Sequence, residues 1–363
     1  MDTNIIYIIY GDEPKSMVSR ILDEIDLERE IPSKDSLIGI KPNLVVAKPY
    51  TSGATTCPHL VEGVVEYLKD KGYNNISILE GAWVGDKTSL AFKVCGYEEI
   101  SKKHNIPLID LQKDSYRDYE VDGISLSVCH SIMEVDYLIN MPVLKGHCQT
   151  HITCALKNMK GCIPNKEKRR FHTMGLHKPI AYLNKVIKQD LIIVDGIIGD
   201  LNFEEGGNPV QMNRVIVGKD PVLIDSYVAQ LLGYDIEDVP YIGMAEEIGV
   251  GRILSWEDNI RELNRDSTPM TIPKTSLVEE LTKNVEENMA CSACYGSLVH
   301  ALDRLRDMGY YDYDGRIYIG QGFKGKRGQG LGIGSCTKGF EKSLPGCPPK
   351  AKDIIEFLKE NWP

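Results

Sequence analysis

Four of the ten cysteines in this chain of 363 residues lie in the C-terminal segment 288–350, and they constrain the fold more than any other feature. Cys291 and Cys294 form a C-x-x-C pair directly before the apolar periodicity of a helix. Thiolates are favoured at a helix N-terminus by its unpaired N–H groups and positive dipole end. Cys336 and Cys347 follow among glycines and prolines, which let the backbone approach bound sulfur closely. The pattern predicts that the four sulfurs converge on one centre.

The spacing of the second pair favours a 4Fe–4S cluster over zinc. Ten residues separate Cys336 from Cys347, whereas a zinc ribbon usually brings two closely spaced pairs. Four thiolates can hold a 4Fe–4S cluster, and proline directly after a ligand cysteine recurs in iron–sulfur sequences. The G-C-P-P at 346–349 resembles the sequence around a cluster ligand in hydrogenase small subunits. Zinc bound by the four cysteines is the second interpretation, and unligated thiols or disulfides are the third.

Charge and hydropathy exclude several classes of protein. A net charge of −10 and a pI near 5.4 speak against nucleic-acid binding, which needs a basic face. No apolar stretch approaches the roughly 20 residues that span a bilayer, so no membrane segment is expected. The first residues predict a strand rather than a signal peptide. Many cysteines in such a chain predict a reducing compartment, and we expect a soluble, cytoplasmic protein.

Short apolar runs alternate with helical periodicity up to about residue 265, and this order predicts an α/β fold with a mostly parallel, helix-covered sheet. We expect domain 1–265 to have this fold and domain 266–363 to be a small α+β, cysteine-rich cluster domain, with the boundary in the polar segment Ser255–Thr282. The predicted strands are Ile5–Tyr10, Leu37–Val46, Ile76–Glu80, Leu108–Leu111, Val135–Met141, Leu191–Ile198, Val215–Gly218 and Arg316–Gly320. The predicted helices are Pro14–Glu30, His59–Lys71, Leu90–His104, Lys178–Gln189, Pro221–Leu232, one after Cys294, and Lys350–Asn361. A hairpin is expected around Asp122-Gly123.

Polar residues follow the predicted strands and suggest a site for a small anionic ligand. Lys41 and Asn43 end one strand ahead of a loop rich in glycine and threonine, a position where open α/β sheets bind ligands. The segment 140–177 holds many lysines, with five of the eight histidines between His130 and His177. Such a local positive field suits a carboxylate or phosphate. We expect Lys41, Asn43, Lys157 and Asn158 to bind substrate; a capping loop and a solvated basic loop are the simpler alternatives.

Three residues of this region are candidate catalytic groups: Lys145, His147 and Asp195. Asp195 follows a predicted strand and would reach the same sheet edge as Lys145, where it could hold the lysine charged or act as a base. Asp-Gly is also a common turn. His147 and His151 stand four residues apart, and Cys148 and Cys154 could join them, so the sequence leaves open whether segment 147–177 binds a second metal.

Three stretches of the chain resemble the bacterial and archaeal family called domain of unknown function 362. They are I-K-P-N-L-V, the block from L-I-N-M-P-V-L-K-G-H to L-K-N-M-K-G, and I-I-V-D-G-I-I-G-D followed by V-G-K-D-P-V-L-I-D-S-Y, which together cover most of Leu37–Tyr234. Members of that family are often described as iron–sulfur proteins and have no established reaction. The resemblance therefore implies a cluster but no particular chemistry.

We predict an iron–sulfur protein with one 4Fe–4S cluster that works as an oxidoreductase on a small anionic substrate. An electron carrier or redox sensor without its own substrate is one alternative, and a non-redox enzyme with a structural cluster or zinc is another. Lys324, Lys326 and Arg327 could receive an acidic redox partner protein. If cluster and anion site act together, iron should lie within about 20 Å of Lys145, which is several helix turns.

Overall fold

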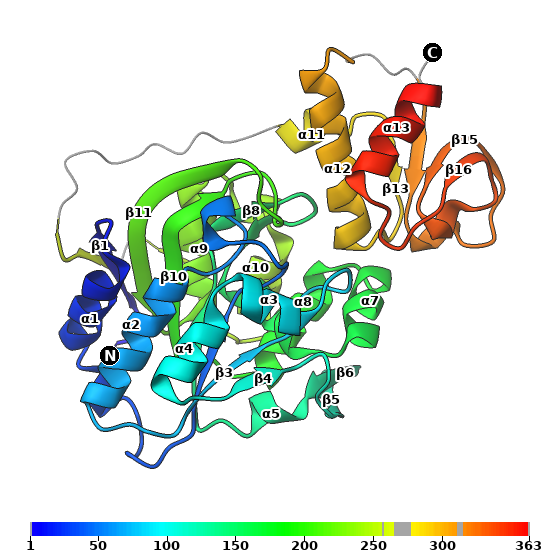
Figure 1. Ribbon diagram of the computed structural model, residues 1–363. Helices are drawn as coiled ribbons and strands as arrows, with labels where there is room; N and C mark the ends of the chain where they lie inside the picture. The colour runs from blue at the N-terminus through cyan, green and yellow to red at the C-terminus, as the bar shows by residue number, and fades with distance from the viewer. Residues whose placement is uncertain (1, 256–257, 265–276, 311–314, 362–363) are drawn as a thin grey trace. The chain divides into compact units, whose positions relative to one another are not determined.

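The computed structural model describes residues 2–255, 258–264, 277–310 and 315–361 (Figure 1). The chain forms two compact units. The large unit combines Met1–Lys168 with His177–Lys274, and the small unit combines Arg169–Leu176 with Thr275–Pro363. The predicted domain boundary between residues 265 and 266 lies outside the described residues.

An eight-stranded sheet forms the centre of the large unit, in the order β12-β1-β11-β10-β7-β2-β3-β4. All neighbouring strands are parallel except β11, which is antiparallel to both β1 and β10. The predicted mixed α/β fold with a mostly parallel sheet is thus confirmed. The strands are β1 (Ile5–Tyr10), β2 (Ile38–Pro42), β3 (Ile76–Glu80), β4 (Leu108–Asp110), β7 (Tyr137–Met141), β10 (Leu191–Asp200), β11 (Pro209–Gly218) and β12 (Asn259–Glu262).

The central strands are mostly apolar and are buried on both faces. Every residue of β2, β3 and β7 is buried. Each fully buried aliphatic side chain, such as Ile40 or Ile78, contributes about 1.5–3 kcal/mol relative to exposure. The carboxyl ends of these strands share one edge, where Lys41 lies opposite Asn140 and Glu80 opposite Asp110. Polar residues at this edge come from strands far apart in sequence.

Helices with one apolar face pack on this sheet, and several begin at a proline, whose missing N–H suits a first helical position. Asp220 also caps α9, because its carboxylate accepts the N–H groups of Val222 and Leu223. The predicted helix Leu90–His104 is two helices, since Gly96 adopts φ 83° between them. The helices are α1 (Pro14–Glu24), α2 (Pro58–Asp70), α3 (Thr88–Val94), α4 (Tyr97–His104), α8 (His177–Val186), α9 (Pro221–Leu231) and α10 (Pro240–Glu247).

Smaller elements lie between β4 and α8. The predicted hairpin is confirmed: β5 (Tyr116–Val121) pairs with β6 (Ile124–Cys129), and both Asp122 and Gly123 have positive φ, as a two-residue type I′ turn requires. A second hairpin, β8 (Lys145–His147) with β9 (His151–Thr153), was not predicted. The remaining elements are α5 (His130–Met133), α6 (Ala155–Asn158) and α7 (Asn165–Thr173).

The small unit contains a four-stranded parallel sheet in sequential order, β13-β14-β15-β16, with helices α11, α12 and α13 (Figure 1). Its core joins Leu298 and Leu305 of α12 to Ile317 and Ile333 of the sheet and Leu358 of α13, all buried. The elements are α11 (Leu277–Leu281), β13 (Val285–Glu287), α12 (Ser292–Asp307), β14 (Ile317–Ile319), β15 (Gly328–Ile333), β16 (Phe340–Leu344) and α13 (Ala351–Asn361).

Of the helices that the structure describes, none is both long enough and apolar enough to cross a membrane.

Candidate functional site

The four cysteines of the small unit come together from three positions in the chain. Cys291 caps α12, with its carbonyl accepting the N–H of Cys294, and Cys294 lies in the first helical turn. Cys336 lies in a 3-10 turn after β15, and Cys347 follows β16. The thiols of Cys291, Cys347 and Cys336 each raise the pKa of Cys294 electrostatically, and Cys294 shares a hydrogen bond with Cys347. The structure therefore groups the four predicted ligands.

The four thiols influence one another electrostatically. Burial raises the pKa of the Cys294 thiol above its ordinary range, and the other three thiols raise it further. Burial also raises the pKa of Cys336, while the Lys324 ammonium opposes that shift. None of the four forms a disulfide, and Cys347 is exposed to solvent. Four sulfurs that repel one another when ionised are stabilised by a metal centre that neutralises them.

Glycine fixes the two loops that carry Cys336 and Cys347. The N–H of Ser335 donates to the carbonyl of Gly346 at 2.8 Å, which ties the loops together. Gly346 has φ 144°, and a side chain there would meet Pro349 at 2.6 Å. The amide of Gln321 donates to the Cys291 sulfur at 3.7 Å. Hydrogen bonds to sulfur are among the features that tune iron–sulfur clusters, so this donor set fits such a group.

In the large unit, the predicted lysines and asparagines form one buried network at the carboxyl ends of β2, β3 and β7. The Lys41 ammonium pairs with Glu80 at 2.8 Å and also donates to the side chain of Asn158 at 3.3 Å. Asn43 donates to the same Asn158 oxygen at 2.8 Å and accepts a hydrogen bond from Lys145 at 2.9 Å. Lys41 and Lys145 thus lie on the same sheet edge, joined through Asn43.

Lys41 and Lys145 have no N–H donors left for a ligand. Lys41 donates to Glu80, Asn158 and the carbonyl of Pro42. Lys145 donates to Asn43 and to the carbonyls of Ala54 and Glu204. A lysine ammonium has three donors, so both are fully satisfied. Burial lowers the pKa of Lys145 to about 7, and the neighbouring Lys157 adds to this shift, whereas the carboxylate charges of Glu204, Asp200 and Glu80 oppose it.

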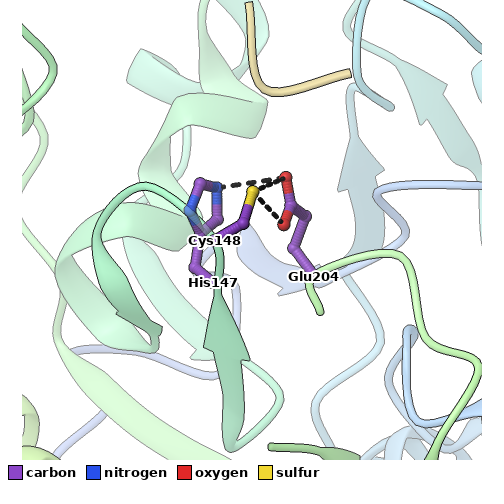
Figure 2. Close-up of side chains that lie close together, drawn as sticks. All are labelled: His147, Cys148 and Glu204. Carbon is purple, nitrogen blue, oxygen red and sulfur yellow. Dashed lines mark hydrogen bonds and ion pairs between the residues drawn. The ribbon is translucent and has the colours of Figure 1, made fainter. Parts of the chain in front are cut away.

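Next to this network lie His147, Cys148 and Glu204 (Figure 2). Glu204 comes from the loop between β10 and β11, and its oxygens lie 3.4 Å from Nε2 of His147 and 3.2 Å from the sulfur of Cys148. Burial and the Glu204 charge raise the pKa of Cys148, so this group is a thiol that donates to the carboxylate. Sequence reasoning missed Glu204 because it follows no predicted strand.

Lys157 in α6 faces the same carboxylate. It is 8% exposed, and its ammonium donates to Thr153 Oγ1 at 3.2 Å. Burial lowers the pKa of Lys157 to about 8, and the Glu204 charge opposes that shift. Of the predicted substrate-binding lysines, Lys157 differs from Lys41 in keeping unused donors.

A metal at His147, Cys148 and Glu204 fits the distances but not the protonation of the histidine. The three possible ligand atoms lie within 4.8 Å of one another. However, Nδ1 of His147 accepts the backbone N–H groups of Gln149 and Thr150, at 3.0 and 3.2 Å. The neutral ring therefore carries its proton on Nε2, the atom that would need a lone pair for the metal. The arrangement is that of a hydrogen-bonded set.

The other candidates for a second metal have different surroundings. The ring of His151 packs on Tyr234 at 5.0 Å, and Cys154 is buried beside Asp225. Neither belongs to a group of three possible ligand side chains among the described residues. The predicted histidine pair at 147 and 151 therefore does not form a shared metal site in this part of the structure.

Asp195 in β10 anchors the start of α2. Its carboxylate accepts the N–H groups of Cys57 at 2.7 Å and Ile197 at 2.9 Å. Burial raises the pKa of Asp195 to about 6. Within the described part of the chain its side chain forms no hydrogen bond to Lys145, so the structure gives it a capping position rather than the predicted contact with that lysine.

The large unit is an α/β protein with a mostly parallel sheet and a buried network of lysines and asparagines at its strand ends. The chain belongs to the family described as domain of unknown function (DUF362), whose model matches residues 38–230. The matched region runs from the start of β2 into α9 and holds the whole network. The four-cysteine segment of the small unit, Thr275–Pro363, lies outside the matched region.

Two individual proteins are similar to this chain. A thylakoid-associated protein of Synechocystis sp. is 25% identical over 218 residues, which cover 58% of this chain and 67% of that protein. The solved structure of a lactate racemase apoprotein from Thermoanaerobacterium thermosaccharolyticum matches with a TM-score of 0.40 and 13% identity. That match covers 59% of this chain and 54% of the racemase.

Proposed function

We propose that this protein holds one 4Fe–4S cluster on Cys291, Cys294, Cys336 and Cys347. The observation that carries the proposal is the convergence of these four sulfurs from three separate segments. When bound, such a cluster supplies one-electron transfer. None of the ten cysteines is in a disulfide, which supports a reducing, cytoplasmic location.

We further propose that the protein is an oxidoreductase acting on a small anionic substrate bound in the large unit. Lys157 supports this, because a buried ammonium with unused donors suits an anion. Electrons would come from, or go to, a redox partner protein. The exposed Cys347 favours an alternative in which the chain is an electron carrier without a substrate, since exposed clusters exchange electrons readily with partners.

The test is chemical analysis of anaerobically purified protein. We expect about four iron and about four acid-labile sulfide per chain and no stoichiometric zinc. One zinc per chain without sulfide would overturn the cluster. A change in the cluster's reduction potential when a small anion binds would favour the oxidoreductase over the electron carrier.

A further inference from the structure

Lys157 is a buried ammonium whose hydrogen bonds are incomplete. Its three N–H donors meet one acceptor among the described residues, Thr153 Oγ1 at 3.2 Å. Lys145 close by is also buried but has three acceptors. Leaving donors of a buried charged group without acceptors is energetically costly. The position therefore calls for acceptor atoms from a ligand.

Glu204 provides a complementary group on the other side. Its carboxylate acts electrostatically on Lys157, yet no lysine nitrogen and carboxylate oxygen of this pair lie within 4.0 Å. A carboxylate has about four lone-pair positions; the Cys148 thiol donates to this one, and Nε2 of His147 lies 3.4 Å from it. Because these two donors also fix its orientation, Glu204 can accept a further hydrogen bond in a defined direction. Lys157 thus has N–H donors, and Glu204 has lone pairs, that a ligand between them could use.

His177 adds a third incomplete group. Its Nδ1 is buried and has no hydrogen-bond partner among the described residues. Burial lowers the pKa of His177, and nearby His151 and Lys157 lower it further, which places these basic groups of β9, α6 and α8 near one another. The carboxylate of Glu204 interacts electrostatically with Lys157, which belongs to this basic group.

We propose that Lys157, His177 and Glu204 bind a small oxyanion that carries its own O–H donor. The oxyanion oxygens accept from Lys157, and the O–H donates to Glu204. Hydrogen phosphate and the simplest hydroxy carboxylate, glycolate, have this chemistry. An oxyanion without a proton, such as sulfate or acetate, would place its lone pairs against the Glu204 carboxylate and be repelled. This inference narrows the proposed anionic substrate and rests on that part of the proposed function.

Calorimetric titration of the full-length chain at neutral pH tests the site, with phosphate against sulfate and glycolate against acetate as probes. We expect phosphate to bind at least about tenfold more tightly than sulfate, since a hydrogen bond to a charged group is worth about 1.5–3 kcal/mol. The phosphate and glycolate arms tell an inorganic from an organic ligand. Lys157→Gln should weaken binding at least about tenfold, whereas Lys188→Gln, whose side chain is 88% exposed, should change nothing.

Glu204→Gln separates a ligand contact from a structural role. The glutamine amide can donate to sulfate, so this variant should bind sulfate more tightly than the wild type and lose its preference for phosphate. A damaged fold cannot strengthen binding. Equal binding of phosphate and sulfate by the wild type, binding that survives Lys157→Gln, or no binding of any probe at about 10 mM would overturn the inference.

Iron and sulfide measured on the same samples keep the two proposals apart. If the protein prefers phosphate but contains no iron or sulfide, the anion site is supported and the cluster proposal is wrong. If the protein contains the cluster but shows no preference among the anions, the cluster proposal is supported and the anion site is wrong.

Discussion

The lysine and asparagine network of the large unit and the four-cysteine group of the small unit differ in how their charged groups are compensated. In the network, Lys41 meets Glu80 at 2.8 Å, and each ammonium donor of Lys41 and Lys145 finds an oxygen within the protein. In the cysteine group, the sulfurs face one another, and their ionised forms repel. The hydrogen bonds of the network are completed within the protein, whereas the cysteine group would be completed by the proposed cluster.

The two groups also differ in what supports them. The network stands on regular elements, namely the end of β2 in the large sheet, the β8 strand and the helix α6, and both Lys41 and Lys145 are fully buried. The cysteines stand on a helix start and two loops, and Cys347 is exposed. Damage to the network should therefore lower stability, whereas damage to the cysteine group should remove a ligand and leave the large unit folded.

Replacing a cysteine ligand should give the largest effect. We expect Cys294→Ser to lower the iron content per chain by more than about tenfold, because a ligand contributes at least as much as its supporting contacts. The control is Cys129→Ser, since the serine hydroxyl can keep the hydrogen bond that Cys129 makes to the Leu111 carbonyl at 3.3 Å. Equal iron in both variants would show that Cys294 is not a ligand.

Breaking the network should cost folding energy instead. Lys41→Met leaves the buried Glu80 carboxylate without its ammonium partner, and loss of one member of a buried ion pair typically lowers the free energy of unfolding by about 3–5 kcal/mol. Chemical denaturation would measure it, with the exposed Lys188→Met as control. A loss of unfolding free energy below about 1 kcal/mol would contradict a stabilising role for the Lys41–Glu80 ion pair.

Asp195→Asn should have a smaller and pH-dependent effect. Below about pH 4 the variant should lose about 0.5–2 kcal/mol of stability, as typical for a weakened helix cap, and the loss should shrink as the pH rises towards 6. Since burial raises the pKa of Asp195 to about 6, its protonated form is favoured in the folded state. Its contribution is complete below the unfolded pKa of about 3.9 and is lost as the pH rises towards 6. Between about pH 4 and pH 6 the free energy of unfolding, measured by chemical denaturation at each pH, should change less with pH in the variant than in the wild type. The same pH dependence in both proteins, or a loss of phosphate binding in the variant, would argue for a different role.

The smallest effect is expected at the rim of the cysteine group. The Lys324 ammonium lowers the pKa of the Cys336 thiol, so Lys324→Gln should slow alkylation of Cys336 in the metal-free chain by about two- to threefold at low salt. Salt at about 1 M should remove the difference, because it screens exposed charges. Lys342→Gln serves as the control, and a salt-independent difference would point to a steric cause.

Much of the large unit could be predicted from its sequence because local patterns decide it. The strand Ile76–Glu80 and the hairpin turn at Asp122-Gly123 are bounded by residues that allow few other structures. The β10–β11 hairpin could not be predicted, since the whole segment 201–208 separates its strands, which is longer than the two- to five-residue loops that identify a hairpin in sequence. The β8–β9 hairpin is polar, and its position depends on packing against distant residues.

The candidate site shows the same limit. Lys41, Asn43 and Asn158 could be predicted to meet, because carboxyl ends of parallel strands share an edge. Glu204 could not, since a loop brings it to His147. A signal for this exists in the glycines: a side chain at Gly146 would meet the carbonyl of Leu201 at 2.2 Å, and one at Gly199 would meet that of Leu144 at 2.0 Å. Glycine at both positions permits the close approach that carries Glu204 into the site.

The short connections of the small parallel sheet have a consequence for the order of folding. Parallel strands usually need a crossover of a dozen or more residues, yet only residues 320–327 separate β14 from β15, and only 334–339 separate β15 from β16. The large sheet, by contrast, pairs Tyr7 with Val217 across most of its unit. Closing short loops costs less chain entropy, and local contacts form faster. We therefore expect the strands around Cys336 to pair early, so that the loops bearing Cys336 and Cys347 are in place before the long-range sheet of the large unit is complete.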